Sequence, residues 1–340
     1  MKANSRDLVA KPIEENEEVT IGVGDRAKSI FWRLNARDVA LFVVLVGISI
    51  YFTVQSQYFF QTDNLLNIAR SAAVNGIVAA GETMVLISGG LDLSISSVMA
   101  AAGMVTAASI HAGLPPYLAI LVGLSFGAVV GFINGIIITK MRINPLITTL
   151  ATMAIIRGYC YVANNGLSFP IGDETFRSLG LGKLFDIPKP AILLIIVYAI
   201  VYVLLRYTQF GRYVYAIGGN ANSCRLCGLN VDRWRLITYV LCGICAAFGG
   251  IVLTAIAGTA IPNSALGYEL IVISAVILGG TSLAGGEGSV LGTLLAMIVI
   301  STIANGMTIL NYPVFWQQII RGFILLLAVL IDAAQTGGYK

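Results

Sequence analysis

Long apolar runs recur along almost the whole chain and constrain its fold more than any other feature. Of the 340 residues, 57% are hydrophobic and 11% are charged, whereas a soluble domain typically has about 45–50% and about 25%. A compact core of this size cannot hide so many apolar side chains, so much of the surface must face lipid. The composition therefore excludes a cytosolic globular enzyme and predicts one polytopic membrane unit.

The runs predict about ten transmembrane helices, because a helix crosses the hydrocarbon core with about 20 residues. Glycine interrupts the stretches 71–111 and 267–307, which indicates broken or re-entrant segments. We therefore predict an all-α polytopic membrane fold with one transmembrane domain over 39–332. The predicted spans are 39–58, 71–88, 96–111, 117–139, 145–163, 190–206, 236–257, 267–283, 289–307 and 315–332.

The placement of basic residues predicts the orientation of the chain. With the N-terminus inside, 15 of the 21 Lys and Arg residues fall on the cytoplasmic side, and positive charge resists translocation. Both termini are therefore predicted to be cytoplasmic, with tails over 1–38 and 333–340, a basic cytoplasmic loop over 207–235 and an external connection over 164–189. The net charge is +4, but the placement of Lys and Arg indicates membrane orientation and not affinity for nucleic acid, so no nucleic-acid partner is predicted.

Five ionisable residues lie within or at the edge of apolar spans: Glu82, Asp92, Arg157, Glu269 and Arg321. Each costs at least about 2.5–3.5 kcal/mol at the bilayer centre, so we expect them to face a cavity or one another. They are candidates for lining or gating a translocation path. The alternatives are paired structural ions and positions at the membrane interface.

Two glycine-centred segments resemble one another. They are Val85-Leu-Ile-Ser-Gly-Gly-Leu-Asp-Leu-Ser94 and Ala275-Val-Ile-Leu-Gly-Gly-Thr-Ser-Leu-Ala284. Paired glycines allow backbone to leave a helix and to expose amides to a water-filled cavity. The alternative is close helix packing through small residues. The predicted path or gating residues are Glu82, Gly89, Gly90, Asp92, Ser94, Glu269, Gly279 and Gly280.

The cysteines show the spacing of a zinc site, but their setting argues against one. Cys224-x-x-Cys227 and Cys242-x-x-Cys245 resemble a structural zinc motif. The second pair, however, lies inside an apolar run, where a charged thiolate cluster would have to enter the bilayer. We expect no metal site and interpret these cysteines as small apolar side chains at helix contacts.

Catalytic motifs are equally weak. Gly123-Leu-Ser-Phe-Gly127 matches a nucleophile elbow, but the only histidine, His111, offers no clear triad. The same glycines belong to a series with a spacing of four, Gly123, Gly127, Gly131 and Gly135, which lets another helix approach closely. No Gly-x-x-x-x-Gly-Lys-Ser/Thr loop occurs, so any ATP-driven role needs a partner subunit.

The loop over 207–235 is long, basic and rich in glycine between two membrane helices. Asn220 is expected to cap a short helix that runs to Leu226 or Cys227, with Gly228 at its C-terminal end. Such a helix would lie flat under the membrane as a docking surface. The alternative is a solvated turn between helices.

Several motifs, in order along the chain, resemble those of ribose-type sugar ABC importer permeases. The loop contains Phe-Gly-Arg, Ala-Ile-Gly-Gly-Asn and a later glycine, as does the family's coupling segment. Further matches are Gly89-Gly-Leu-Asp-Leu-Ser94, Asn144-Pro-Leu-Ile-Thr-Thr-Leu150, Gly267-Tyr-Glu-Leu270 and Gly279-Gly-Thr-Ser-Leu-Ala-Gly-Gly286. The resemblance covers roughly residues 39–332.

The resemblance implies a homodimeric permease of the bacterial inner membrane. It would take a sugar from a periplasmic binding protein and contact a cytoplasmic ATPase, which would bind and hydrolyse ATP with Mg²⁺, while this chain itself would bind no cofactor. The residues that the resemblance assigns to ATPase coupling are Gly211, Arg212, Gly218, Gly219, Asn220, Arg225 and Gly228.

The leading prediction is thus a transport subunit, not an enzyme, that imports a monosaccharide or related polyol by alternating access. The alternative is an ion-coupled secondary sugar transporter that uses Glu82 or Asp92 as a proton relay. An intramembrane hydrolase is disfavoured because a histidine partner is missing. The sequence does not identify the sugar.

Overall fold

The computed structural model describes residues 36–336, and the account below concerns the unit Arg37–Lys340. The predicted tails over 1–38 and 333–340 therefore lie mostly outside the described residues. Where they overlap, α2 begins at Ala36, before the predicted span 39–58, and α13 continues to Thr336, beyond the predicted span 315–332.

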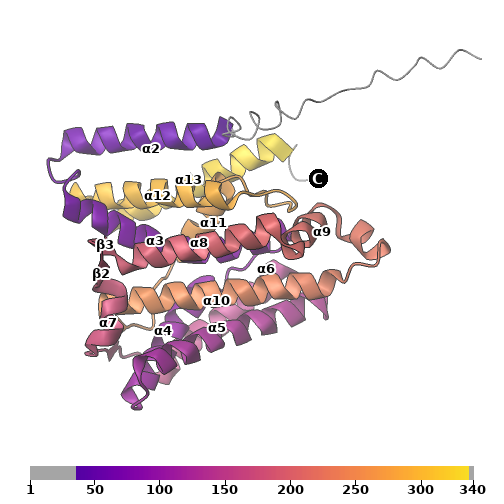
Figure 1. Cartoon of the computed structure of the whole chain (residues 1–340), viewed down its shortest axis with the longest axis horizontal. Coiled ribbons are helices and arrows are strands. Elements are labelled where there is room, and N and C mark those ends of the chain that lie inside the picture. The colour runs from indigo at the N-terminus through magenta and orange to yellow at the C-terminus, as the bar shows by residue number, and fades with distance from the viewer. Residues whose placement is uncertain (1–35, 337–340) are drawn as a thin grey trace, which may run out of the picture. The chain divides into compact units, whose positions relative to one another are not determined.

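Helices dominate the described residues, as predicted. They are α2 (Ala36–Gln55), α3 (Thr62–Ile87), α4 (Ile95–His111), α5 (Pro116–Thr139), α6 (Pro145–Ala163), α7 (Glu174–Leu181), α8 (Lys189–Tyr207), α9 (Gln209–Leu226), α10 (Val231–Ala257), α11 (Tyr268–Leu278), α12 (Val290–Ile309) and α13 (Val314–Thr336). Figure 1 shows the long helices in roughly parallel alignment, with α9 at one end of the bundle and α7 at the other.

Four strands of two residues each depart from the all-α prediction. β1 (Phe169–Pro170) pairs antiparallel with β4 (Thr259–Ala260), and β2 (Lys183–Leu184) pairs antiparallel with β3 (Ile187–Pro188). The predicted connection over 164–189 thus contains β1, α7 and the β2–β3 ribbon. These ribbons are too short to change the helical class of the fold.

Seven described helices are long and apolar enough to cross a membrane: α2, α5, α6, α8, α10, α12 and α13. The remaining predicted spans correspond to α3, α4 and α11. Of these, α4 and α11 are apolar but shorter, with 17 and 11 residues. The polytopic class is confirmed, and the count of ten crossings stays a prediction.

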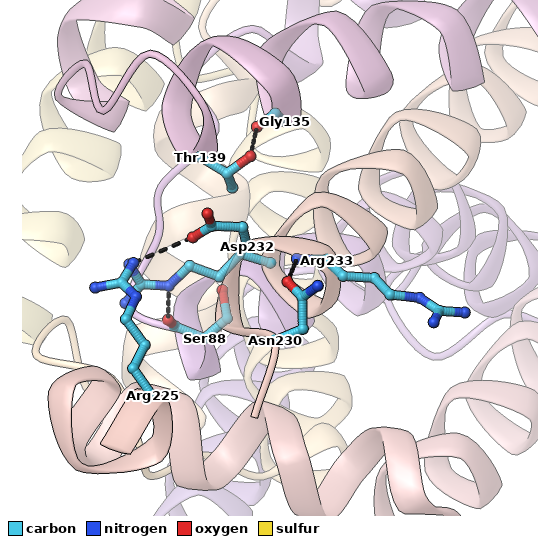
Figure 2. Close-up of polar contacts among 8 residues, drawn as sticks. Ser88, Gly135, Thr139, Arg225, Asn230, Asp232 and Arg233 are labelled. Atoms are coloured by element: carbon cyan, nitrogen blue, oxygen red, sulfur yellow. Dashed lines mark hydrogen bonds and ion pairs between the residues drawn. The ribbon is translucent and has the colours of Figure 1, made fainter. Parts of the chain in front are cut away.

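Helix boundaries follow local sequence signals. Asn144 accepts a hydrogen bond from the Leu146 amide at 2.8 Å, and Pro145 begins α6, where its missing N–H costs nothing. Asn230 caps α10 in the same way, accepting from the Arg233 amide at 3.0 Å (Figure 2). These side chains satisfy amides that the first helical turn leaves without partners.

The centre of the unit is α10, which packs against α3, α4 and α5. The glycine series on α5 makes this contact possible, as the spacing predicts. A Cβ atom at Gly127 would overlap the Gly243 carbonyl, and one at Gly131 would overlap the Tyr239 carbonyl. Gly123 and the elbow-like motif therefore lie within a packed helix and not on a strand-to-helix turn.

Candidate functional site

The two predicted helix breaks are present in the structure. α3 ends at Ile87 and α4 begins at Ile95, while α11 ends at Leu278 and α12 begins at Val290. In both places the helical conformation therefore ends next to the paired glycines, directly after an apolar helix.

Both breaks begin with the same hydrogen-bonded turn. At the first, Gly89 has φ +76° and the Gly90 amide donates to the Val85 carbonyl at 3.0 Å. At the second, Gly280 has φ +101° and the Thr281 amide donates to the Val276 carbonyl at 3.1 Å. This is the Schellman geometry that glycine favours. The left-handed residue is the first glycine of one pair and the second of the other, so the alignment of the pairs is offset by one residue.

Asp92 and Ser94 fix the path of the chain from the first break into α4. The Asp92 carboxylate accepts from the Ser94 amide at 2.9 Å and from its hydroxyl at 2.6 Å. Asn134 on α5 donates to the Ser94 hydroxyl at 3.0 Å and accepts from Thr152 on α6 at 2.7 Å. One buried polar network therefore ties the break to α5 and α6.

Glu82 lies on the other side of the same break and is fully buried. Its carboxylate accepts from the Asp92 amide at 3.0 Å and from the Cys242 thiol at 3.4 Å. Buried polar groups without partners are costly, so these contacts hold Asp92 against α3. Cys242 thus has a hydrogen-bonding role that its prediction as a small packing residue did not include.

Two more side chains of α10 hold the first break. Arg235 donates to the Ser88 carbonyl at 3.0 Å (Figure 2). The Tyr239 hydroxyl accepts from the Leu91 amide at 3.3 Å. A Cβ atom at Gly90 would lie 2.5 Å from that hydroxyl, so the absence of a side chain at Gly90 lets Tyr239 reach the backbone.

The polar path residues predicted at the first break, Glu82, Asp92 and Ser94, are buried, whereas Gly89 and Gly90 are half-buried. They do not line the cavity between α3, α11, α12 and α13, the one between α2, α3 and α12, or the one beside α4 and α6. In this conformation their contacts are structural, and a role in lining the translocation path stays a prediction.

Helix α9 occupies much of the predicted cytoplasmic loop over 207–235. It bends at Asn220, which has φ −156° and ψ 94°. Asn220 accepts from the Ser223 amide at 2.9 Å, and Gly228, with φ +82°, closes the second helical piece. The predicted capped helix after Asn220 is therefore confirmed, while a preceding helical piece from Gln209 was not predicted.

Gly218 of α9 lies where the two breaks meet. The Gly286 amide donates to the Ile87 carbonyl at 2.9 Å, which joins the second break to the first. A Cβ atom at Gly218 would overlap both of these backbone groups, and one at Gly285 would lie 2.8 Å from the Cα atom of Gly89. We call the contact of Ile87, Gly89, Gly218, Gly285 and Gly286 the glycine junction.

Tyr215 adds a side-chain bond to the glycine junction. Its hydroxyl donates to the Gly288 carbonyl at 2.9 Å. Burial raises the pKa of this phenol, which keeps it in the neutral, donating form. Movement of α9 would therefore pull on the second break through Tyr215 and on both breaks through Gly218.

The other predicted coupling residues differ in their surroundings. Gly211 is buried, and a Cβ atom there would overlap the Leu205 carbonyl, so its role is the turn from α8 into α9. Arg212 is exposed. Arg225 is also exposed and forms an ion pair with Asp232 at 3.1 Å (Figure 2).

Glu269 and Arg157 lie apart from the glycine junction. Arg157 donates to the carbonyls of Pro262 and Ser264 at 2.8 and 2.9 Å, while its second terminal nitrogen is buried without a partner among residues 36–336. One Glu269 oxygen is likewise buried without a partner in this part of the chain. The structure thus separates Glu269 from the other predicted path residues instead of gathering them in one site.

Several contact residues were missed at the sequence level: Asn134, Thr152, Tyr215, Arg235, Tyr239, Gly285 and Gly286. Two signals were available. Asn134 stands between Gly131 and Gly135 on an apolar helix, where a polar residue needs a partner. The run Gly285-Gly286-x-Gly288 predicts a turn into the next helix, and both Gly285 and Gly286 have the positive φ that glycine tolerates.

A metal site is not indicated by the geometry. Within residues 36–336, no group of three or more His, Cys, Asp or Glu side chains is placed to hold an ion. The two pairs of the zinc-like motif also differ in environment, because Cys227 is exposed while Cys242 is buried on α10.

Comparison with known proteins identifies the family to which the chain belongs. The family model for "Branched-chain amino acid transport system / permease component" matches residues 64–329. Ribose import permease protein RbsC of Escherichia coli K12 is 36% identical over 305 residues, 88% of this chain and 94% of the relative. RbsC of Bacillus subtilis is 40% identical over 298 residues, 87% and 91% of the two chains. No solved structure matches.

A third relative names the transporter class directly. The L-arabinose ABC transporter permease protein AraH of Azospirillum brasilense is 37% identical over 309 residues, 90% of each chain. The fold is that of a multi-pass membrane protein, in which the helix breaks after α3 and α11 lie against α9. The chain belongs to the ABC importer permease family that includes these proteins and is a multi-pass protein of the inner membrane.

Proposed function

We propose that the chain imports a monosaccharide or related polyol and is driven by a separate ATPase subunit. The glycine junction is the observation that carries this proposal. One helix, α9, contacts both helix breaks at once, so a force applied to α9 reaches both interrupted segments. This is the arrangement that a transport subunit without its own ATP site needs.

The sugar class follows from the relatives, which are named for ribose and L-arabinose. ATP and Mg²⁺ would be bound by the ATPase and no cofactor by this chain. The ATPase would dock on α9 and a periplasmic binding protein at the opposite end, where α7 lies. The start of α2 and the end of α13 lie at the same end as α9 (Figure 1), which fits cytoplasmic termini.

A second copy of the chain is part of the proposal. The outer helices α2 and α13 carry many exposed apolar side chains, among them Phe42, Val54, Phe315 and Phe323. Lipid and a second copy would both cover such surfaces, and the family resemblance favours a homodimer.

Proteoliposomes that contain the permease, its ATPase and its binding protein test the function. We expect uptake of radiolabelled ribose or arabinose that requires ATP on the side of the membrane where the ATPase is bound. Dissipation of the proton gradient should not change this uptake. Uptake that persists without the ATPase and stops with the proton gradient would select the ion-coupled alternative. Product formation from sugar would contradict a pure transport role.

Replacing Arg225 by Glu tests whether α9 docks the ATPase. Because Arg225 is exposed, loss of its pair with Asp232 should cost less than about 1 kcal/mol of stability. We expect normal membrane insertion but at least a tenfold loss of uptake, since a positive docking charge is reversed. Co-purification with the ATPase and uptake are the measurements.

The charge-swap variant Arg225→Glu with Asp232→Arg is the matched control. It restores an ion pair between these positions but keeps the reversed charge at position 225. If the swap recovers normal uptake, the pair acts only within this chain and the docking role is wrong. If uptake stays low, the charge at position 225 is needed by a partner.

A further inference from the structure

A second group of polar side chains, separate from the glycine junction, surrounds a cavity among the membrane helices. It is a small cavity of about 60 Å³ between α3, α11, α12 and α13. Its polar lining consists of Ser71, Asn75, Tyr268, Ser301, Gln317 and Arg321. Among apolar membrane helices such a gathering of hydroxyl, amide and guanidinium groups requires an explanation.

Asn75 is a buried polar group of this cavity that lacks a partner in the described part of the chain. Its side chain is 8% exposed, and its carbonyl oxygen has no hydrogen-bond partner within the described residues. A buried amide oxygen without a donor is destabilising, because it has lost its bonds to water. A donor supplied by a ligand or by water in the cavity would remove this cost.

Arg321 on α13 brings a positive charge to the lining of the cavity. Gln317 and Arg321 are one turn apart on α13 and line the cavity together. The structure gives Gln317 one weak bond, to Thr308 at 3.3 Å. It gives Arg321 no ion pair with any described residue, so its guanidinium donors are available to a ligand.

The cavity lies toward the end of the bundle opposite α9. Asn75 lies at the middle of α3, Tyr268 begins α11 and Gln317 lies in the first turn of α13, whereas the C-terminal ends of α3 and α11 lead into the breaks. With α9 in the cytoplasm, as proposed above, the cavity is in the outer half of the membrane. A substrate released by a periplasmic protein would reach this half first.

We propose that this cavity is the outer sugar-binding site of the transport path, closed in the present conformation. Asn75 would accept and Gln317 and Arg321 would donate hydrogen bonds to sugar hydroxyls, which are both donors and acceptors. Tyr268 offers an aromatic ring for the apolar face of the sugar. The inference rests on the proposed function and assigns a site to its substrate.

The size of the cavity requires that it opens. About 60 Å³ holds about two water-sized groups, which is less than a monosaccharide. Of the helices that line the cavity, α13 can move most easily. Only 6% of the residues in its most apolar stretch are buried within the chain, compared with 61% in α12. Displacement of α13 therefore breaks few internal contacts while it carries Gln317 and Arg321 with it.

Adjacent glutamines provide the test. Gln317 lines the cavity and Gln318 is exposed and does not, so Gln317→Leu and Gln318→Leu make the same change one residue apart. In the proteoliposomes described above, we expect Gln317→Leu and Arg321→Gln to lower the rate of ribose or arabinose uptake at least tenfold. ATP hydrolysis stimulated by the loaded binding protein should stay within twofold of wild type in all three variants, and Gln318→Leu should transport normally.

The outcomes separate this site from the function as a whole. Normal uptake by Gln317→Leu and Arg321→Gln, beside active wild type, would overturn the site and leave the proposed function intact. Equal losses of uptake and ATP hydrolysis would also overturn it, because they indicate a structural role. Absence of sugar uptake by wild type would overturn both proposals.

Discussion

Replacing Gly218 by Ala should abolish transport, with uptake below a tenth of wild type, although the change adds one methyl group. The added Cβ atom would overlap the Ile87 carbonyl and the Gly286 amide. These are backbone atoms joined to each other by a hydrogen bond, so neither can rotate away. Relief requires α9 to separate from both breaks, at about 1–3 kcal/mol for overpacking of this kind.

Gly219→Ala is the control for the added methyl group: Gly219 belongs to the same predicted coupling segment, but a Cβ atom there would meet nothing within 4 Å. Alanine also suits a helix better than glycine by about 0.5–1 kcal/mol, so this variant should insert and transport at least as well as wild type. Uptake per amount of membrane-inserted permease is the measurement. Equal uptake by the two variants would contradict the view that the glycine junction transmits movement from α9.

Substitutions at the glycine pairs Gly89–Gly90 and Gly127–Gly131 do not separate a helix break from helix packing. The sequence alone suggests that bulky residues at Gly89 and Gly90 harm transport more than at Gly127 and Gly131, if the latter only pack. In the structure Gly127 and Gly131 touch the backbone of α10 directly. Both pairs are therefore intolerant, and the neighbouring Gly218 and Gly219 give the cleaner comparison.

Local features could be predicted from the sequence because their causes lie within a few residues. The paired glycines indicated the helix breaks, the cap at Asn220 indicated the second part of α9, and the spacing of glycines on α5 indicated a close helix contact. Each depends on backbone freedom or on a side chain that reaches a nearby amide.

Contacts across the bundle could not be predicted in this way. Arg235 bonds the Ser88 carbonyl from 147 positions away, and Cys242 bonds Glu82 from 160 positions away. Such pairs depend on which helices become neighbours, and hydropathy carries no information about this. For the same reason the sequence grouped Glu269 with Glu82 and Asp92, whereas the structure separates them.

Replacing Asp92 by Leu should destabilise the permease and stop transport, whereas Asp92→Asn should retain much of both. The Asp92 carboxylate accepts two hydrogen bonds from Ser94, at 2.9 and 2.6 Å. An asparagine carbonyl can accept both, but leucine leaves a buried amide and a buried hydroxyl without an acceptor. That loss should cost about 2–3 kcal/mol, seen as less permease in the membrane and a lower melting temperature in detergent.

Asp63→Leu, the same change at an exposed position in the first turn of α3, controls for the loss of a carboxylate as such and should behave nearly as wild type. Asp92→Asn is the decisive variant for the role of charge. If it inserts normally and keeps at least about a third of wild-type uptake, Asp92 acts as a hydrogen-bond acceptor that shapes the first break. If it inserts normally but transports no better than Asp92→Leu, the negative charge itself is required, because the two variants would then share only the loss of that charge.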